Sequence, residues 1–452
     1  MPSQRQLAES VIRRLRQAGH EALLAGGCVR DLLLGRPAKD YDVATSARPD
    51  AVLELYGDAL TLGQAFGVVI VHDGAVQVEV ATFRSDAAYT DGRHPDAVAF
   101  TDARHDALRR DFTINAMFLD PTSGEILDHV GGRNDLKRRI IRAVGDPRVR
   151  FAEDHLRMLR AVRFAAELEF DIERATAAAV RDLAGKIAGV SGERIAAELA
   201  RLLTASPAGR RRGLQLADEL GLLARLLPEV HAMHGTDQGP TVHPEGDAFV
   251  HTVLCVGHLR EPTFELALAA LLHDVGKPPT AMHRDGKWTF YGHAKVGEGA
   301  AGDVCRRLRL SNYERRRVAW LVGHHMNLLN WDQMREARLK RLFAHDGFDE
   351  LAELWRADCL ASGGTADEYD ALMVRYRAMG RHEVRPAPLI SGRDLIEMGL
   401  EPGPAFRRIL DRVYDAQLEH RVITRDDALA LARQVAAEPP EAEGRGQSCS
   451  SR

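Results

Sequence analysis

Two aspartates separated by one residue, Asp40 and Asp42, follow a glycine pair and an arginine in the sequence LLAGGCVRDLLLGRPAKDYDVAT. On an extended strand such aspartates project from one face, so both carboxylates can bind one hard divalent cation. Gly26 and Gly27 let backbone amides approach a phosphate without an intervening Cβ, and Arg30 adds a positive charge for the same anion. These residues predict a nucleotidyl-transfer site, where bound metal supports in-line attack of a hydroxyl on an α-phosphate.

A third carboxylate lies on the segment Val76 to Phe83, VQVEVATF. Alternate residues of a strand face the same way, which makes Glu79 a candidate third catalytic carboxylate. A solvated residue on the exposed face of that strand would show the same pattern, so both interpretations stay open for Glu79.

Three motifs, in this order, resemble the class II tRNA nucleotidyltransferase and poly(A) polymerase family. They are GGCVRDLLLGRPAKDYD, RRDFTINAM at Arg109 to Met117 and EDHLRMLRAVRF at Glu153 to Phe164. The resemblance spans roughly residues 20–205. It implies an α+β head of the polymerase-β-like nucleotidyltransferase type, with a mixed sheet and helices, followed by a mainly α-helical neck, body and tail. It also implies that Asp40 and Asp42 are catalytic and hold Mg²⁺.

The same resemblance implies a nucleotide pocket. The matching positions are Gly27, Arg30, Arg110, Asp111, Asp154, Arg157, Arg160 and Arg163. Arg110 and Asp111 would lie against the triphosphate and the ribose. In this family protein side chains select the base, and Asp154 with Arg157 offers an acceptor beside a donor, which complements the Watson–Crick edges of C and A. Their spacing predicts a shared helix face, although a solvated face would carry a similar row of charges.

Metal-ligating residue types recur further along the chain in the order of an HD-type phosphohydrolase. Imidazole and carboxylate ligands suit a divalent transition metal, and an aspartate next to a histidine can bridge two ions. The resemblance implies a first metal set of His251, His273, Asp274 and Asp358, and a second set of His293 and His324, with His325 as the competitor of His324. A degenerate HD fold retained for tRNA binding is the alternative.

Hydrophobic periodicity indicates the elements that position these residues. Residues 4–17 predict an amphipathic helix, EALLAGG with Gly67 to His72 and Val76 to Phe83 predict short strands, and the pattern from about Phe151 onward is helical. The predicted domains are the head at 1–145, the neck at 146–235, the HD body at 236–385, a helical tRNA-binding tail at 386–437 and a disordered end at 438–452.

Composition narrows the class of protein. No apolar run approaches the length that spans a bilayer, and the first residues lack the apolar core of a secretory signal, so we predict a cytoplasmic protein. Five cysteines without a CxxC pair argue against a disulfide framework. The net charge is −4, yet Leu136 to Arg212 holds 17 Lys and Arg against 10 Asp and Glu. This excess suggests a segment that faces phosphates, although a bundle with solvated arginines would also show it.

We therefore predict an enzyme that adds or repairs the 3′-terminal CCA of tRNA from CTP and ATP without a template, together with an HD phosphohydrolase activity. The segment Arg84 to Val98 resembles the flexible loop of family members that add the final A, and TLGQAFGVVIV is unlike the matching stretch of bacterial poly(A) polymerases. An A-adding enzyme or a poly(A) polymerase is the alternative within the family. A phosphohydrolase or an RNA-binding protein with a vestigial head is the alternative of another class.

Overall fold

The structure is a computed structural model that describes residues 3–57, 59–61, 67–86, 98–239, 246–284 and 287–438. The chain divides into two compact units, Met1–Gly323 and His324–Arg452, which we describe separately. Three predictions fall wholly or largely outside the described residues: the loop within Arg84 to Val98, part of the stretch TLGQAFGVVIV, and the disordered end at 438–452.

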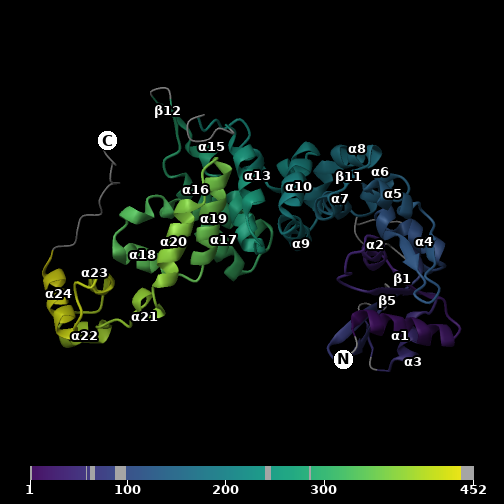
Figure 1. Cartoon of the computed structure of the whole chain (residues 1–452), viewed down its shortest axis with the longest axis horizontal. Coiled ribbons are helices and arrows are strands. Elements are labelled where there is room, and N and C mark those ends of the chain that lie inside the picture. Colours follow the sequence, from purple (N-terminus) through teal and green to yellow (C-terminus); the bar gives the residue numbers. More distant parts are fainter. Residues whose placement is uncertain are drawn as a thin grey trace. The chain divides into compact units, whose positions relative to one another are not determined.

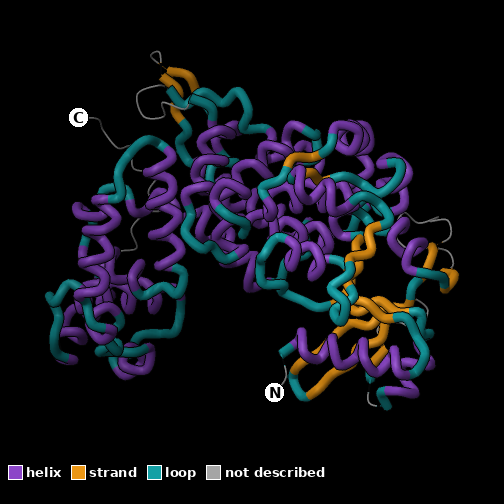
Figure 2. Tube along the Cα trace, turned by 45° about the vertical axis from the view of Figure 1, so that its right-hand side comes forward, coloured by secondary structure: helices purple, strands orange, loops and turns teal. Residues whose placement is uncertain are grey.

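The first unit begins with a mixed seven-stranded sheet in the order β3-β4-β5-β2-β1-β8-β9 (Figure 2). Its strands are β1 (Ala22–Ala25), β2 (Asp42–Thr45), β3 (Leu60–Thr61), β4 (Val68–Asp73), β5 (Val76–Thr82), β8 (Met117–Leu119) and β9 (Ile126–Asp128). Strands β2 and β5 run parallel, and the other neighbouring pairs are antiparallel. The three strands predicted from the sequence are confirmed by β1, β4 and β5.

Helices cover both faces of this sheet. The head helices are α1 (Gln4–Gln17), α2 (Gly27–Leu33), α3 (Pro49–Leu55), α4 (Ala103–Arg109) and α5 (Gly132–Arg138), and a small ladder joins β6 (Arg84–Asp86) to β7 (Val98–Phe100). Helix α1 begins with a capping box between Ser3 and Gln6 and buries Leu7, Val11 and Leu15 at helical spacing, which confirms the predicted helix at 4–17. All four residues of β1 are buried, as expected for a strand covered on both faces.

The neck follows as a helical layer. Its elements are α6 (Pro147–Glu153), α7 (Leu156–Leu168), α8 (Arg174–Leu183), α9 (Gly192–Leu203), α10 (Pro207–Glu219), α11 (Leu223–Leu226) and α12 (Pro228–His231), with β10 (Ile140–Ile141) paired in parallel to β11 (Asp171–Ile172). Helix α7 is buried along most of its length and packs against α9 and α10 (Figure 1). This central helix carries the predicted arginine row, so packing of the neck sets where that row points.

The remainder of the first unit is also helical. It contains α13 (Ala248–His258), α14 (Phe264–Leu272), α15 (Lys277–Thr280), α16 (His293–Arg307) and α17 (Asn312–His324), and a short hairpin of β12 (Met282–Arg284) and β13 (Lys287–Thr289). Helix α13 packs against α10 of the neck and against α14. The last residue of α17 begins the second unit.

The second unit is helical throughout its described residues. Its helices are α18 (Glu336–Phe343), α19 (Phe348–Ala361), α20 (Asp367–Ala378), α21 (Arg381–Val384), α22 (Gly392–Glu397), α23 (Pro404–Leu418) and α24 (Arg425–Ala437). Residues of α22, α23 and α24, including Leu395, Val413 and Ala432, form one buried cluster. The predicted class, a mixed-sheet head followed by mainly helical domains, is confirmed. Among the described helices, none combines the length and the apolar character that crossing a bilayer requires.

Candidate functional site

Asp40 and Asp42 lie at the end of the head sheet where β2 begins and β1 ends. Asp42 is the first residue of β2, and Asp40 is exposed in the loop just before it. The antiparallel register pairs Asp42 with Ala25, so the glycines after β1 lie beside the carboxylate. Gly26 has φ 75°, and a Cβ there would lie 3.1 Å from Nη1 of Arg110. A side chain at Gly26 would therefore be strained and would crowd the site.

The electrostatics of Asp42 indicate a place for a cation. Burial, together with the carboxylates of Glu79 and Asp40, raises the pKa of Asp42 to about 6, although the Arg110 guanidinium opposes the shift. Glu79 is exposed on β5, which runs parallel to β2 with Val43 opposite Val80. Glu79 thus lies close enough to Asp42 for their charges to repel. The three carboxylates form a donor set that fits a hard divalent cation, because such a cation would relieve their repulsion.

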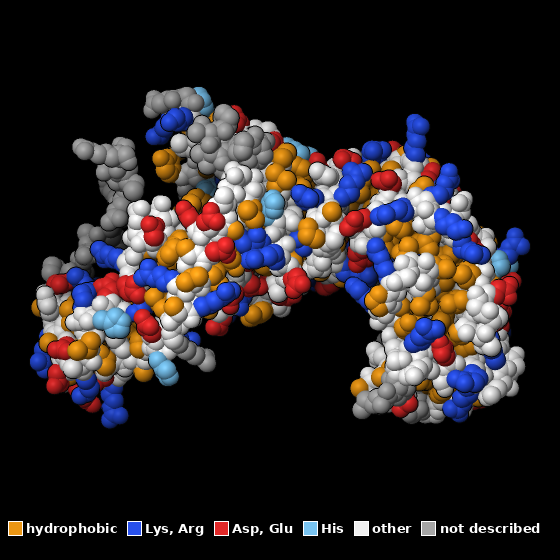
Figure 3. All heavy atoms as spheres, in the orientation of Figure 1, with side chains coloured by type: hydrophobic (Ala, Val, Ile, Leu, Met, Phe, Trp, Pro, Cys, Tyr) orange, Lys and Arg blue, Asp and Glu red, His pale blue; other side chains and the backbone are white. Residues whose placement is uncertain are grey.

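A cavity of about 750 Å³ joins the aspartates to the neck helices. The predicted site residues that line it are Gly27, Arg30, Asp40, Asp42, Arg110, Asp111, Asp154, Arg157, Arg160 and Arg163. Glu79 is not among the lining residues, although its charge reaches Asp42. Figure 3 shows Lys and Arg side chains interspersed with acidic ones over the neck. The cavity brings together motifs that lie more than a hundred residues apart in the sequence.

Two arginines from different motifs are held in place by one asparagine. Arg30 is nearly buried and donates from Nη1 to Oδ1 of Asn115 at 2.7 Å. Arg110 donates to the Asn115 carbonyl at 3.2 Å and to Oδ2 of Asp106 at 3.0 Å. Both guanidinium groups line the cavity as fixed positive charges, suited to a polyphosphate. Neither Asn115 nor Asp106 was predicted from the sequence, although Asn115 stands inside the motif RRDFTINAM.

Asp111 forms an ion pair across the head and neck. Its Oδ2 accepts from Nε and Nη2 of Arg160 at 2.9 and 2.6 Å, and its Oδ1 accepts from the backbone N–H of Phe112 at 2.7 Å. Burial acts to raise the pKa of Asp111, but the Arg160 guanidinium outweighs burial and lowers this pKa to about 2. In the free protein Asp111 therefore orients Arg160, and its predicted contact with the ribose stays a prediction.

This ion pair predicts a pH-dependent loss of stability. Asp111→Asn should lower the free energy of unfolding by about 2 kcal/mol at neutral pH, because the folded pKa lies well below the unfolded value. A lowered carboxyl pKa stabilises the protein above the unfolded pKa and ceases to do so as pH falls through the folded pKa. The difference should thus shrink between about pH 4 and pH 2. Chemical denaturation at both ends of this window measures it.

The control for that experiment is Asp171→Asn, which changes an exposed aspartate of the neck. This variant should stay within about 0.5 kcal/mol of the parent at every pH. A deficit for Asp111→Asn that does not change with pH would contradict the ion-pair account.

The predicted base-selecting residues do not share a helix. Helix α6 ends at Glu153, Asp154 is extended with φ −147° and ψ 106°, and Arg157 lies in the first turn of α7. The expectation of a common helix face for Asp154 and Arg157 is therefore wrong. Its physical reason is local: Asp154 accepts a hydrogen bond at 3.1 Å from the N–H of Leu156 and so marks the start of a new helix. Both side chains nevertheless line the cavity.

Each of these two residues has another ionic partner in the free protein. Oδ2 of Asp154 accepts from Nη2 of Arg194 at 2.7 Å, and Nη1 of Arg157 donates to Oε2 of Glu153 at 2.5 Å. A base that used both side chains would have to compete with these contacts. Neither partner was predicted from the sequence. Glu153 opens the motif EDHLRMLRAVRF, whereas no sequence signal marks Arg194.

Arg163 differs from Arg160 in its exposure. Its side chain is fully buried, pairs with Glu167 and Glu198, and lies 3.7 Å from the centre of the Phe164 ring. Arg160, which pairs with Glu198 as well, keeps part of its side chain exposed. Arg163 therefore supports the wall of the cavity. Arg160, which is partly exposed, can make the predicted contact with a nucleotide more readily than Arg163. Glu198 links the two arginines and was not anticipated.

Part of the predicted HD set is assembled within the first unit. His251 lies on α13, His273 and Asp274 follow α14, and His293 begins α16. All four side chains are buried. The Nε2 atoms of His251, His273 and His293 lie 3.9, 3.2 and 3.6 Å from the Asp274 carboxylate. The ligand atoms of His251, His273 and Asp274 are all within 4.8 Å of one another, so this group could hold a metal ion.

The hydrogen bonds of this group suit metal ligation. Nδ1 of His273 contacts the carbonyl of Ala270 at 2.8 Å, and Nδ1 of His293 contacts the carbonyl of Phe290 at 2.9 Å. Such a bond places the proton on Nδ1 and leaves Nε2 free to bind a cation. Burial lowers the pKa of His293, which favours the neutral ring that a metal requires.

A lysine in the same motif completes the charge balance. Nζ of Lys277 lies 2.6 Å from Oδ2 of Asp274 and donates to Gln238. Burial acts to raise the pKa of Asp274, but the charges of His273 and Lys277 hold this pKa well below its usual value. Asp274 is therefore an anion. Lys277 stands three residues after Asp274 in the sequence ALLHDVGKP, and no residue pattern pointed to a role for it.

The other predicted HD ligands belong to the second unit. His324 is its first residue, His325 begins a short 3₁₀ helix, and Asp358 lies on α19. Their assignment as metal ligands stays a prediction.

The chain matches three protein-family descriptions in succession. Residues 22–142 match the "Poly A polymerase head domain", residues 169–233 match the "Probable RNA and SrmB- binding site of polymerase A", and residues 251–360 match the "HD domain". The first match contains the double aspartate, and the third contains the buried histidines.

Curated relatives match either nearly the whole chain or about half of it. A CCA-adding enzyme of Levilactobacillus brevis is 31% identical over 94% of this chain and 95% of its own length. CCA-adding enzymes of Bacillus pumilus and of a Geobacillus strain are 47% and 42% identical, over 43% and 49% of this chain. The chain spans about half the length of these last two relatives, 48% and 54%.

Solved structures extend the likeness to the fold. The Bacillus stearothermophilus CCA-adding enzyme in complex with CTP has a TM-score of 0.72 and 27% identity, over 96% of this chain and 98% of that one. The Thermotoga maritima CCA-adding enzyme complexed with tRNA has a TM-score of 0.58 and 20% identity, over 95% of each chain. The second likeness shows the fold alone.

Proposed function

The chain belongs to the family of the CCA-adding enzymes, and on this premise we propose that it adds or repairs the 3′-terminal CCA of tRNA from CTP and ATP without a template. One observation carries the proposal. One cavity is lined by Asp40 and Asp42 and also by Asp154 and Arg157, so the groups proposed to bind metal and to read the base share one space.

The head residues divide the work of nucleotidyl transfer. Asp40 and Asp42, with Glu79 beside them, would hold Mg²⁺, which when bound activates the attacking hydroxyl and stabilises the leaving pyrophosphate. Arg30 and Arg110 are anchored before substrate arrives, so they bind the triphosphate at little cost in side-chain order. Gly27 lines the same cavity.

The neck residues select the base. Asp154 accepts from the amino group of C or A, and Arg157 donates to the adjacent ring nitrogen. Uracil presents a carbonyl where C has its amino group, so Asp154 repels it. Arg194 and Glu153 hold these two side chains until a nucleotide replaces them.

This role predicts a change of specificity. Asp154→Asn should lower kcat/KM for CTP by about 10- to 100-fold and narrow the preference for CTP over UTP by a similar factor, since one charged base contact is lost. Single-nucleotide incorporation into a tRNA transcript with each triphosphate measures both. The control is Asp146→Asn, which changes an aspartate that caps α6 and is absent from the cavity lining. If the ratio of kcat/KM for CTP to kcat/KM for UTP does not change in Asp154→Asn, Asp154 does not select the base.

The HD group supports a second activity, metal-dependent hydrolysis of a phosphate ester. A divalent transition metal fits the buried imidazoles of His251 and His273 and the anionic Asp274, and when bound it would supply an activated water. Lys277 keeps the carboxylate oriented. His293, whose Nε2 lies 3.6 Å from the Asp274 carboxylate, is proposed with His324 for the second metal. The ligands His324 and Asp358, with His325 as the competitor of His324, are proposed to complete the two metal sets.

We divide the chain as predicted, into a head at 1–145, a neck at 146–235, an HD body at 236–385 and a tail at 386–437. The neck and tail are proposed to bind tRNA through its phosphates and shape. We place the reaction in the cytoplasm, in keeping with the free thiols of the described cysteines.

Three tRNA transcripts test the main proposal. They end at the discriminator base, at C and at CC, and each is incubated with Mg²⁺ and CTP, ATP or both. Extension of all three to CCA is the expected result. Extension of the CC transcript alone would make the protein an A-adding enzyme, and no extension with purified folded protein would favour an RNA-binding protein or a hydrolase with a vestigial head.

A further inference from the structure

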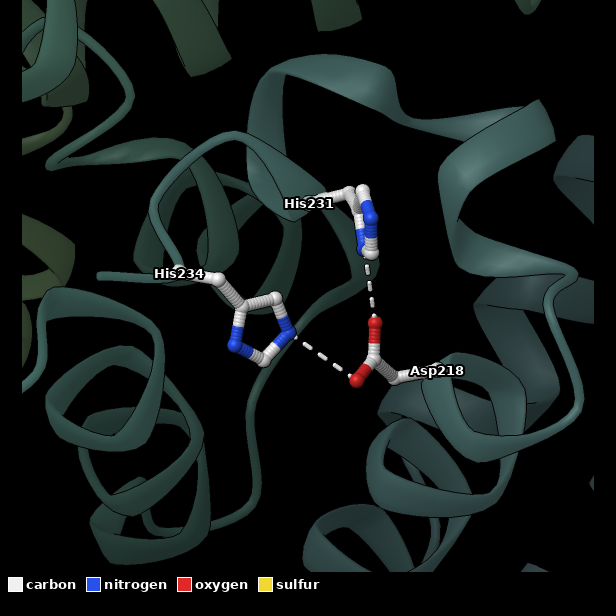
Figure 4. Close-up of side chains that lie close together, drawn as sticks. All are labelled: Asp218, His231 and His234. Carbon is white, nitrogen blue, oxygen red and sulfur yellow. Dashed lines mark hydrogen bonds and ion pairs between the residues drawn. The ribbon is translucent and has the colours of Figure 1, made fainter. Parts of the chain in front are cut away.

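Three side chains meet at the end of the neck, away from the residues discussed above. Asp218 lies near the end of α10, His231 ends α12, and His234 follows three residues later. Oδ1 of Asp218 lies 2.9 Å from Nδ1 of His231, and Oδ2 lies 2.9 Å from Nε2 of His234. Figure 4 shows the carboxylate between the two imidazoles, with one ring nitrogen of each directed at one oxygen.

We propose that Asp218, His231 and His234 form a binding site for a divalent transition metal such as Zn²⁺. Two imidazole nitrogens and one carboxylate oxygen are a common ligand set for zinc, with water in the remaining position. The three ligand atoms all lie within 4.8 Å of one another. Ligand atoms around tetrahedral zinc are roughly 3.3 Å apart. Each nitrogen–oxygen contact in this group, at 2.9 Å, is a few tenths of an ångström shorter than that spacing.

The rings are already held in suitable orientations. His234 packs against Phe249 of α13, with ring centres 4.0 Å apart and planes tilted by 34°. The two imidazoles are 5.2 Å apart with an interplanar angle of 71°, which lets their nitrogens approach one point from different directions. The backbone is fixed nearby, because the N–H of Gly235 donates to Oδ2 of Asp247 at 2.6 Å. Binding would therefore require little further ordering.

The site is accessible to an ion from solvent. The side chains of His231 and His234 are 49% and 39% exposed, and that of Asp218 is 18% exposed. Water can thus complete the coordination, which separates this group from the buried HD residues. A bound metal would tie α10 to α12 and to the loop that follows α12, where the chain passes from the neck to the HD region.

Without metal, the same atoms form a hydrogen-bonded His–Asp–His group. The two states differ in what lies between the ring nitrogens and the carboxylate, protons in one and a cation in the other. Metal binding therefore requires neutral imidazoles and should weaken in acid. The proposal would be overturned if these three residues form only the hydrogen-bonded group and bind no metal ion.

Zn²⁺ binding to the full-length protein distinguishes these outcomes. Equilibrium dialysis near neutral pH is run on the parent and on His231→Gln, His234→Gln and Asp218→Asn, which keep polar side chains of similar size. Each variant should lose one Zn²⁺ per chain or bind it at least about 100-fold more weakly, since even indirect supporting residues cost 10- to 100-fold. Zn²⁺ bound in the head or HD region adds the same number of ions per chain to the parent and to each variant. It therefore does not affect the difference between them.

The matched control is His105→Gln. His105 is an exposed histidine whose Nδ1 also contacts an aspartate, Asp102, at 2.7 Å, but it is not part of the three-residue group. The control should bind as many Zn²⁺ ions as the parent. Co²⁺ gives a second readout, because loss of an imidazole ligand alters its visible absorption. Parent-like Zn²⁺ stoichiometry and affinity in both histidine variants would overturn the proposal.

Discussion

Asp42→Asn should abolish CTP and ATP incorporation, with kcat reduced by at least about 10³-fold. The substitution keeps the shape of the side chain but removes the charge at the start of β2 where three carboxylates lie close together. The measurement is the rate of single-nucleotide addition to a tRNA transcript at saturating Mg²⁺ and nucleotide. Binding of tRNA should persist, because the tRNA contacts are proposed for the neck and tail.

The same substitution should also change the thermal stability of the metal-free protein. Burial and the neighbouring carboxylates raise the pKa of Asp42, so its charge is unfavourable in the metal-free protein at neutral pH. Asp42→Asn should then raise the thermal midpoint in chelator while activity is lost. Asp73→Asn, at the exposed end of β4 in the same sheet, is the control and should change neither property. If Asp42→Asn keeps near-parent activity, the double aspartate does not take part in catalysis.

Asp274→Asn should eliminate metal-dependent phosphohydrolase activity, with a loss of at least about 10³-fold, and leave CCA addition intact. Asp274 contacts His273, His293 and Lys277, so neutralising it removes the anion that a metal would need. Hydrolysis of a 2′,3′-cyclic nucleotide and of a 2′-nucleotide with added Mn²⁺, Ni²⁺ or Zn²⁺ measures the loss. Extension of a tRNA transcript by the same preparation shows that the chain is folded.

Asp274→Asn leaves the Lys277 cation buried without its anion, which could itself disturb the local structure. A second variant therefore separates this effect from the loss of a metal ligand. His273→Gln keeps Asp274 and Lys277 paired and should show the same loss of hydrolysis. His283→Gln, on the exposed hairpin strand β12, is the histidine control and should hydrolyse normally. Hydrolysis that survives both Asp274→Asn and His273→Gln would mean that the HD group serves structure or tRNA binding instead.

Local features of the sequence predicted much of the head. The helix at residues 4–17 and the strands at β1, β4 and β5 follow from periodicity, because the side of an element that is buried is encoded in neighbouring residues. The spacing of Asp40 and Asp42 likewise predicted a shared metal site, and their order relative to the other motifs indicated the family. The helix, the strands and the shared metal site each follow from a short stretch of residues, whereas the family is indicated by three motifs spread over roughly residues 20–205.

The break between α6 and α7 shows the limit of such reasoning. The spacing suggested one helix face for Asp154 and Arg157, yet Asp154 lies between the two helices, after α6, and Arg157 lies on α7. A side-chain hydrogen bond to the backbone competed with helix continuation and prevailed. Both residues still reach the cavity, because the neck packs against the head there.

The sequence by itself determined which side chains are present for chemistry: paired carboxylates, a row of arginines, and an ordered set of histidines. Only the tertiary structure decided their partners. Parallel pairing of β2 with β5 brings Glu79 within reach of Asp42, and the packing of α7 against α9 gives Arg160 and Arg163 a common partner in Glu198. Asp218 likewise meets His231 and His234 only through folding. The reason is physical, since a charge pair depends on distance in space, which sequence separation does not specify.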